Sequence, residues 1–295
     1  MNDRDVISDA AWALIAPLLP SSTGCRGGQW RDHRQVCEAI AWRYRTGSPW
    51  RDLPARFGPW QTVWKRHDRW SADGTWHKLV TAAQAHADAA GDLDWLVAVD
   101  STIVRAHQHA AGARHTPPGA AQNHTIRRPD EPPDHALGRS RGGLTTKIHG
   151  ASDGRCRSLT IHVTAGQTHD TTQFATVLAG IGVPRPGGGR PRTRPDRVTA
   201  DKAYSSKANR ALLRRRGIGH TIPEPADQQG HRRRRGRRGG RPCGFDRDIY
   251  RQRNTVERDW NTLKQWRGIA TRYDKTATNY RGGILLAVLL TWTPR

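Results

Sequence analysis

The sequence has little cysteine and no long apolar segment. Its 295 residues include four cysteines, and none of them shows the short paired spacing of a zinc ribbon or a disulfide framework. They are Cys25, Cys37, Cys156 and Cys243. The longest apolar run, residues 284–290, is far too short to span a bilayer, and no signal peptide is recognisable. We therefore expect a cytoplasmic protein in a reducing compartment, without a membrane partner.

Acidic residues are scarce relative to basic ones. Only 26 Asp and Glu stand against 49 Lys and Arg, which gives a net charge of +23. Such an excess attracts polyanions through counterion release, whatever the fold. The composition therefore predicts a nucleic-acid partner. A structural role of the ribosomal kind, or compositional drift in a GC-rich genome, is the open alternative.

Residues 1–90 have the pattern of a helical domain. Ser8 can cap a first helix, and residues 36–44 and 60–67 repeat apolar side chains at helical spacing. Eight of the 12 Trp fall in this segment, among many Arg and Lys. We predict a compact DNA-binding domain here. The alternative is a Trp-rich core with a solvated basic surface, and both can hold together.

Residues 91–295 predict a mixed α/β domain. Residues 153–154 carry a hairpin-turn signal, and 105–140 and 184–197 are expected to be loops. The expected strands are residues 95–100, 144–151, 159–165, 197–201 and 220–222, and the expected helices are 174–181, 209–216 and 248–267. This order fits a ribonuclease H-like fold, although periodicity alone leaves other α/β folds open.

Four side chains share one face of the predicted helix 248–267. Tyr250, Arg253, Glu257 and Lys264 fall within a strip about 60° wide at 100° per residue. An apolar strip adjoins them, so Glu257 is expected at the border of the core. The alternative is a surface helix in which Glu257 pairs with Arg253 or Arg258, as is common on helices.

Three carboxylates occur in distinct contexts: Asp100 and Asp201 each close a predicted strand, and Glu257 lies in that helix. Hard cations such as Mg²⁺, with Mn²⁺ as a substitute, prefer carboxylate oxygens. Two such ions can activate an attacking oxygen and stabilise a leaving one. We predict that the three acids hold the metal, and that Arg253 and Lys264 bind flanking phosphates. Tyr250 and Lys202 are further candidate DNA contacts.

A strongly basic stretch surrounds the second acid, and its densest part lies between the second and third acids. Residues 181–241 contain sixteen Arg and two Lys against four acids. We expect its densest part, residues 231–241, to be a mobile loop that binds DNA phosphates at the mouth of the site. A solvated loop is the alternative. The arginines concerned are Arg232, Arg233, Arg234, Arg235, Arg237 and Arg238.

Several segments together resemble the DDE transposases of bacterial insertion sequences, of the insertion-sequence-four/five superfamily and its five-like group. They include Asp100-Ser101-Thr102, Ala200-Asp201-Lys202-Ala203-Tyr204, the Tyr-Arg-Glu-Lys strip, and residues 46–60, 137–149, 165–170 and 267–275. The resemblance covers nearly the whole chain. It implies a ribonuclease H-like catalytic domain in which Asp100, Asp201 and Glu257 bind metal, and a helical N-terminal domain. Gly27-Gly28-Gln29 departs from a Gly-Arg-Pro-like turn expected there.

Other side chains suggest two alternative sites, a zinc site and a serine nucleophile. His107 and His109, or His162, His169 and Asp170, lack the spacing of a known zinc site. The first two histidines are expected to approach DNA or a metal-bound water. Ser101 as a nucleophile lacks a glycine-flanked elbow and a matched base.

The sequence thus predicts a DNA transposase. It would bind terminal inverted repeats through residues 1–90, cleave the element ends, and transfer 3′ hydroxyls to target DNA. Because joining requires two ends held together, a homodimer or higher synaptic complex is expected, associated with the nucleoid when bound to DNA. A ribonuclease H-like nuclease that does not join strands, and a catalytically inactive DNA-binding protein, are the alternatives.

Overall fold

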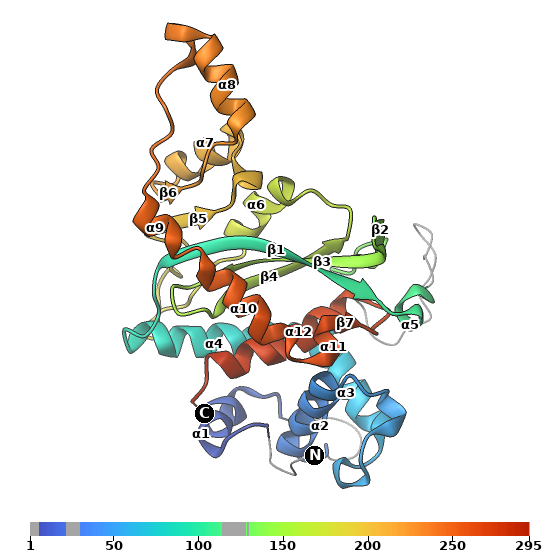
Figure 1. Ribbon diagram of the computed structural model, residues 1–295. Coiled ribbons are helices and arrows are strands. Elements are labelled where there is room, and N and C mark those ends of the chain that lie inside the picture. The colour runs from blue at the N-terminus through green and yellow to red at the C-terminus, as the bar shows by residue number, and fades with distance from the viewer. Residues whose placement is uncertain (1–5, 22–29, 114–127, 129, 295) are drawn as a thin grey trace.

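The structure is a computed structural model that describes residues 6–21, 30–113, 128 and 130–294. Figure 1 shows three parts: a group of N-terminal helices, a central sheet covered by helices, and a helical arm that projects from the sheet. The departure at Gly27-Gly28-Gln29 and most of the proline-rich stretch before residue 130 lie outside the described residues.

The N-terminal part is helical, as expected. Ser8 caps α1 (Asp9–Ile15) by accepting a hydrogen bond from the Ala11 amide, and a 3-10 turn continues it to Leu18. Gly47, at a φ of 71°, ends α2 where the sequence predicts a break. The other helices of this part are α2 (His33–Thr46), α3 (Trp60–Ala72) and α4 (Thr75–Ala89), with 3-10 turns at Trp50–Asp52 and Ala55–Phe57.

The sheet contains seven strands among the described residues. The long strand β1 (Leu96–Ala106) pairs antiparallel with β3 (Gly143–Ser152), which forms a hairpin with β4 (Ser158–Ala165). On its other side β1 pairs parallel with β5 (Arg197–Ala200), and β5 pairs parallel with β6 (Gly219–Thr221). Two short strands, β2 (Gly138–Ser140) and β7 (Thr271–Arg272), extend β3 and β1 at one end.

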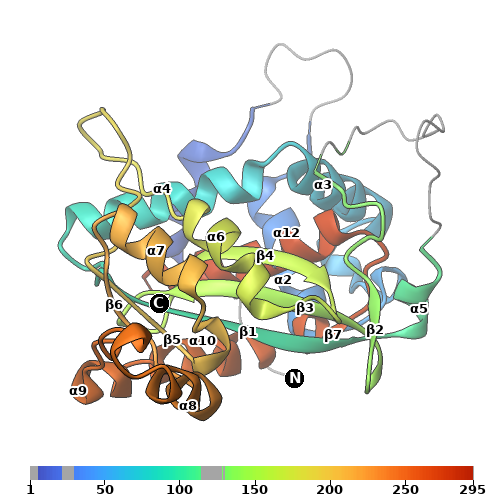
Figure 2. The same ribbon diagram turned by 90° about the horizontal axis from the view of Figure 1, so that it is seen from above.

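Helices cover both faces of this sheet. Figures 1 and 2 show α6 (Asp170–Ala179) and α7 (Lys207–Arg215) on one face, and α10 (Asn254–Lys264) with α12 (Ala277–Thr291) on the other. Three antiparallel strands followed by two parallel ones, with flanking helices, form the expected ribonuclease H-like mixed sheet. None of the described helices has the length and apolarity needed to cross a membrane.

Helix α12 ties the N-terminal helices to the sheet. It packs against α3, α4 and α2 as well as β4, and its apolar residues belong to one core cluster that runs from Ile7 to Trp292. The approach to α2 is close, because a Cβ at Gly283 would lie 2.1 Å from the Tyr44 ring. The division into domains at residue 90 stays a prediction.

A buried polar group joins α2 to the chain that enters α12. The Arg43 guanidinium lies 3.0 Å from the Asp274 carboxylate, and both side chains are almost fully buried. The Tyr44 hydroxyl donates to the same carboxylate at 3.1 Å and lies 3.0 Å from His67 Nε2. Burial lowers the pKa of His67 to about 4, so this imidazole is neutral at physiological pH.

Two expectations about the first and last acid-bearing elements are wrong in detail. Asp100 does not end its strand, because β1 continues to Ala106 and pairs with β3 along that length. The expected helix 248–267 is broken into α9 (Arg247–Arg251) and α10 by i→i+3 hydrogen bonds around Gln252 and Arg253. Tyr250 therefore lies on a different helix from Glu257. The expected loop 105–140 also contains α5 (Gln108–Ala111) and β2.

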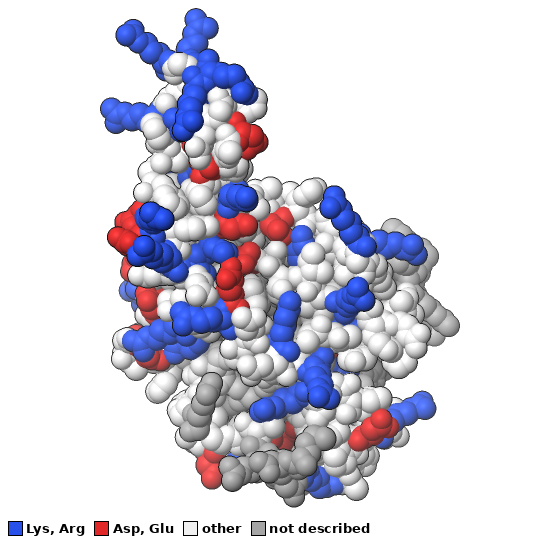
Figure 3. Space-filling view, in the orientation of Figure 1, with Lys and Arg blue, Asp and Glu red and all other residues white. Residues whose placement is uncertain are grey.

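Most of residues 231–241 are helical, whereas the sequence predicts a loop there. They belong to α8 (Ala226–Arg234) and a 3-10 turn at Gly236–Gly239, which together make the projecting arm. No residue of α8 is buried; arginine favours helix, and these side chains spread into water away from the body. Glu224 pairs with Arg232 at 3.0 Å near the base of the arm. Figure 3 shows Lys and Arg side chains over the arm's tip.

Helix α10 is docked on the sheet by two kinds of contact. Asp259 accepts hydrogen bonds from the Ser152 and Ser158 hydroxyls at 2.6 and 2.5 Å. The neighbouring Trp260 packs over Gly150, where an added Cβ would lie 2.6 Å from the Trp260 ring. Gly150 pairs with Asp100 across β1 and β3, so this close approach fixes α10 beside Asp100.

Removing Asp274 should destabilise the protein strongly. Asp274→Ala leaves the Arg43 guanidinium buried without its counter-charge, at an expected cost of about 3–5 kcal/mol in the free energy of unfolding. Urea unfolding measures this loss. The double variant Arg43→Met with Asp274→Leu removes both charges and should lose less. Equal losses in the two variants would show that the ion pair is not the source.

The stability of α10 docking should depend on pH through Asp259. Burial raises the pKa of Asp259 from 3.8 to about 7, although the hydrogen bonds from Ser152 and Ser158 act to lower it. The folded state therefore holds this proton more tightly, so the Asp259 contribution to stability falls as pH rises from about 4 to 7. The Asp259→Asn variant cannot ionise at this position. Its free energy of unfolding, relative to that of wild type, should therefore rise on the order of 2–4 kcal/mol as the pH is raised from 4.5 to 8. Parallel urea curves for the two proteins would contradict this.

Candidate active site

The parallel pairing of β1 with β5 brings the first two acids together. Val99 pairs with Ala200, and the next residue on each strand is an acid, Asp100 or Asp201. Asp201 follows the last residue of β5, and its carboxylate accepts a hydrogen bond from the Ala203 amide at 2.8 Å. That contact caps the 3-10 turn Lys202–Tyr204 and fixes the carboxylate at the strand end.

Glu257 reaches the same place from α10 through Arg253. The Arg253 guanidinium donates to the Glu257 carboxylate, and its other terminal nitrogen lies 3.6 Å from Asp100 Oδ2. The Glu257–Arg253 pair expected for an ordinary surface helix is thus present. It does not exclude the triad, because the same guanidinium also faces Asp100.

The pKa of Asp100 depends on its burial and on the charged groups around it. Burial raises the pKa of Asp100 from 3.8 to about 6, while the Ser101 amide and Arg253 oppose the rise. The charges of Asp201 and Glu257 raise the pKa further. The structure therefore places Asp201 and Glu257 within electrostatic reach of Asp100, although Asp100 and Glu257 lie 157 positions apart along the chain.

The donor set suits a hard divalent cation. Three carboxylates supply only oxygen ligands, and the two that raise the pKa of Asp100 mark a place where positive charge is favoured. Within the described residues, however, no three His, Cys, Asp or Glu are already arranged around one point as metal ligands. The Arg253 guanidinium lies between Asp100 and Glu257 instead. The acids fit a metal ion once that guanidinium withdraws.

The candidate DNA contacts lie around the acids in different ways. The Lys264 ammonium donates to the Thr102 hydroxyl at 2.5 Å and to the Ile103 carbonyl, and burial lowers its pKa. Tyr250 packs against the Phe245 ring at 5.2 Å and lies under Arg253. Lys202 is exposed beside Asp201. Figure 3 shows acidic side chains gathered below the basic arm, where it meets the body.

A second polar cluster lies behind Asp100, on the α6 face of the sheet. Ser101 donates to Asp170 at 2.6 Å, and the Lys147 ammonium lies 3.0 Å from the same carboxylate. Because neighbouring strand residues point to opposite faces, this contact fixes the backbone that carries Asp100. The sequence suggested Ser101 and Asp170 only as a weak nucleophile and a possible metal ligand. Their hydrogen bond could not be predicted from the sequence, because it depends on how α6 packs on the sheet.

Tyr204 ends the segment that begins at Ala200, and the sequence predicts no role for it. Its ring is buried against Phe174, and its hydroxyl has no hydrogen-bond partner among the described residues by distance and angle. Burial and the negative charges of Asp100, Asp170 and Asp201 raise its pKa. The Tyr204 hydroxyl is therefore neutral at physiological pH.

The histidines do not contribute to this site. His107 and His109 stack on each other and on Tyr273, past the far end of β1, roughly 20 Å along the strand from Asp100. The expectation that they approach a metal-bound water beside Asp100 is therefore wrong. His162 lies on β4 and faces His149, with ring centroids 6.5 Å apart.

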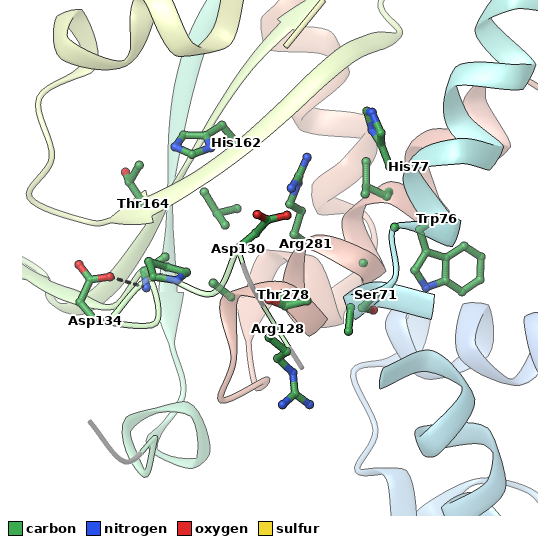
Figure 4. Close-up of a pocket in the computed structure, with 18 of the residues that line it drawn as sticks. Ser71, Trp76, His77, Arg128, Asp130, Asp134, His162, Thr164, Thr278 and Arg281 are labelled. Carbon is green, nitrogen blue, oxygen red and sulfur yellow. Dashed lines mark hydrogen bonds between the residues drawn. The ribbon is translucent and has the colours of Figure 1, made fainter. Parts of the chain in front are cut away.

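A cavity of about 810 Å³ lies away from the acids, between α4, β4 and α12. Figure 4 shows Arg281, His77 and His162 around it, with Asp130 beside Arg281. Burial lowers the pKa of Arg281, and the Asp130 charge opposes that effect. Arg128, which also lines the cavity, pairs with Asp68. Because both arginines are faced by acids, this cavity offers little excess positive charge for a phosphate.

Comparison with known proteins identifies the family of the chain. Residues 7–80 match the family described as a putative transposase of the IS4/5 family, and residues 91–292 match the transposase DDE domain. The chain is 30% identical over 149 residues to a putative transposase for insertion sequence element IS6501 of Brucella ovis, which covers 50% of this chain and 98% of that protein. No solved structure matches the chain.

Two further relatives cover shorter parts of the chain. An insertion element IS402 uncharacterized 16.2 kDa protein of Burkholderia cepacia is 35% identical over 122 residues, which is 39% of this chain and 83% of that protein. An uncharacterized protein of Sinorhizobium fredii is 40% identical over 112 residues, covering 38% of this chain and 86% of that protein. The DDE domain match extends over more than half of the chain. The chain therefore belongs to the DDE transposase family of insertion sequences.

Proposed function

We propose that this protein cuts the ends of an insertion sequence and joins the exposed 3′ hydroxyls to target DNA, with Asp100, Asp201 and Glu257 as its metal-binding catalytic residues. The observation that supports the proposal is the placement of Asp201 and Glu257 near Asp100. Two of the acids come from paired parallel strands and the third from a helix docked across the sheet. The charges of Asp201 and Glu257 both raise the pKa of Asp100.

The acids are proposed to hold Mg²⁺, with Mn²⁺ as a substitute. When bound, the metal supplies activation of the attacking oxygen and stabilisation of the leaving oxygen of a phosphodiester. Asp201 is held for this role by its contact with the Ala203 amide, and Asp100 by the strand pairing on both sides.

Basic side chains around the acids are proposed to bind the DNA backbone. Lys202 and Tyr250 flank the acids, and Lys264 anchors α10 to β1 two residues beyond Asp100. The arm extends this surface with Arg233, Arg234, Arg235, Arg237 and Arg238, which are all exposed, and Arg232, which pairs with Glu224. Arginine binds phosphate oxygens in forked geometry, so the arm fits a duplex backbone.

Residues 1–90 are proposed to recognise the terminal inverted repeats. Trp70 and Trp76 are fully buried there, which supports the Trp-rich core, while Arg51, Arg56 and Arg69 remain exposed. The two interpretations therefore hold together. Because transfer needs two ends at once, a homodimer or higher synaptic complex is proposed as the working form, associated with the nucleoid in the cytoplasm.

One assay separates transposition from simple cleavage. Purified protein is incubated with DNA that carries the element ends, Mg²⁺ and a target plasmid. Joined products support the proposed function. Cleaved ends without joined products identify a ribonuclease H-like nuclease, and end binding without cleavage identifies an inactive DNA-binding protein.

Each acid should be required for chemistry but not for end binding. Asp100→Asn, Asp201→Asn and Glu257→Gln each remove a metal ligand, so the cleavage rate should fall by more than about a hundredfold. Gel-shift affinity for the ends should change little. The matched control is Asp248→Asn, an exposed acid on α9 that pairs only with Arg251 among the described residues. Retained cleavage in all three variants would refute the triad.

The arm should account for part of the salt dependence of DNA binding. Replacing Arg233, Arg235 and Arg237 by Gln removes three exposed charges, and each lost phosphate contact lowers the slope of log affinity against log salt by about 0.9. Fluorescence anisotropy from low to high salt measures this slope. Arg185, Arg190 and Arg194 are exposed in the loop before β5, and their Gln variants form the control. Equal slopes in both sets would contradict a role for the arm.

A further inference from the structure

Arg253 has an unusual position for a DNA contact, because it is already engaged. It lies at the junction of α9 and α10, where it is the residue before the first turn of α10. Its guanidinium bridges Glu257 and Asp100, and only 21% of its side chain is exposed. The burial that should weaken its charge is offset by Glu257, Tyr250 and Asp100, and its pKa is raised.

This bridge is the local source of positive charge at two of the three acids. Across the described parts of the chain, no other Lys or Arg forms an ion pair with Asp100 or Glu257. Lys264, the other cation of the strip, is committed to Thr102 and Ile103 instead. Without Arg253, a half-buried carboxylate beside two more acids would lack a counter-charge, which is costly.

A divalent cation and this guanidinium compete for the same oxygens. Carboxylate oxygens that hold a metal point at the ion, whereas those of Asp100 and Glu257 here face the guanidinium. The acids can therefore satisfy one partner or the other. A phosphate offers Arg253 an alternative partner of equal geometry, because guanidinium binds carboxylate and phosphate through the same fork.

We propose that Arg253 is the internal counter-ion of the metal site: it holds Asp100 and Glu257 while DNA is absent, and yields them when a DNA phosphate takes its place. This inference rests on the proposed function of the acids. It makes Arg253 a positioning residue that couples DNA binding to metal loading. Release needs only rotation of the long side chain, since Arg253 lies at a break between two helices rather than inside one.

The test is the affinity of the DNA-free protein for Mn²⁺, measured by the loss of the free Mn²⁺ signal in electron paramagnetic resonance. Arg253→Gln removes the competing charge, so the Mn²⁺ dissociation constant should fall on the order of tenfold. Arg253→Lys keeps the charge but cannot bridge both acids with a fork, so its affinity should lie between those of wild type and Arg253→Gln. A role for Arg253 limited to DNA phosphates predicts no change in either variant.

Two controls separate the possible failures. Arg258→Gln removes the same charge from an exposed neighbour on α10 that forms no ion pair with these acids, and it should leave Mn²⁺ affinity within about twofold. Asp100→Asn should abolish Mn²⁺ binding. If it does, and Arg253→Gln fails to bind Mn²⁺ more tightly, the counter-ion inference is overturned while the triad stands. If Asp100→Asn binds Mn²⁺ like wild type, the proposed metal site itself is wrong.

Discussion

The structure is organised around the cost of holding like charges together. Burial raises the pKa of Asp100 to about 6, and the charges of Asp201 and Glu257 raise it further, so gathering these carboxylates carries a cost without a metal. Nothing in the acids themselves brings them together. Strand pairing fixes the first two, and the docking of α10 supplies the third, so the apolar core provides the free energy that the carboxylates lack.

Much of this arrangement could be predicted from the sequence. Apolar runs that end near an acid indicated β1 and β5, and the turn at residues 153–154 indicated the β3–β4 hairpin, because these signals are local. Once β1 and β5 are parallel neighbours, Asp100 and Asp201 must be adjacent. The i,i+4 spacing of Arg253 and Glu257 also indicated their contact, as the alternative to a role of Arg253 on phosphate.

The remaining features depend on tertiary contacts that no local pattern encodes. Gly150 looks like an unremarkable strand residue, yet it is the place where Trp260 packs on the sheet. The continuation of β1 past Asp100 is stabilised by its pairing with β3. The helical arm differs from the expected loop because its arginines need no core to adopt helix, a possibility that charge counting alone obscures.

The arm lies between β6 and α9, outside the paired strands of the sheet. It leaves the body after β6 and returns at α9, and no strand pairing passes through it. Its length can therefore vary between related proteins without disturbing the sheet. Its return leads directly into the α9–α10 junction, so a mechanical load on the arm is delivered first to the segment that carries Arg253. A helix with no buried residue is thus joined through a short segment to the residue that bridges Asp100 and Glu257.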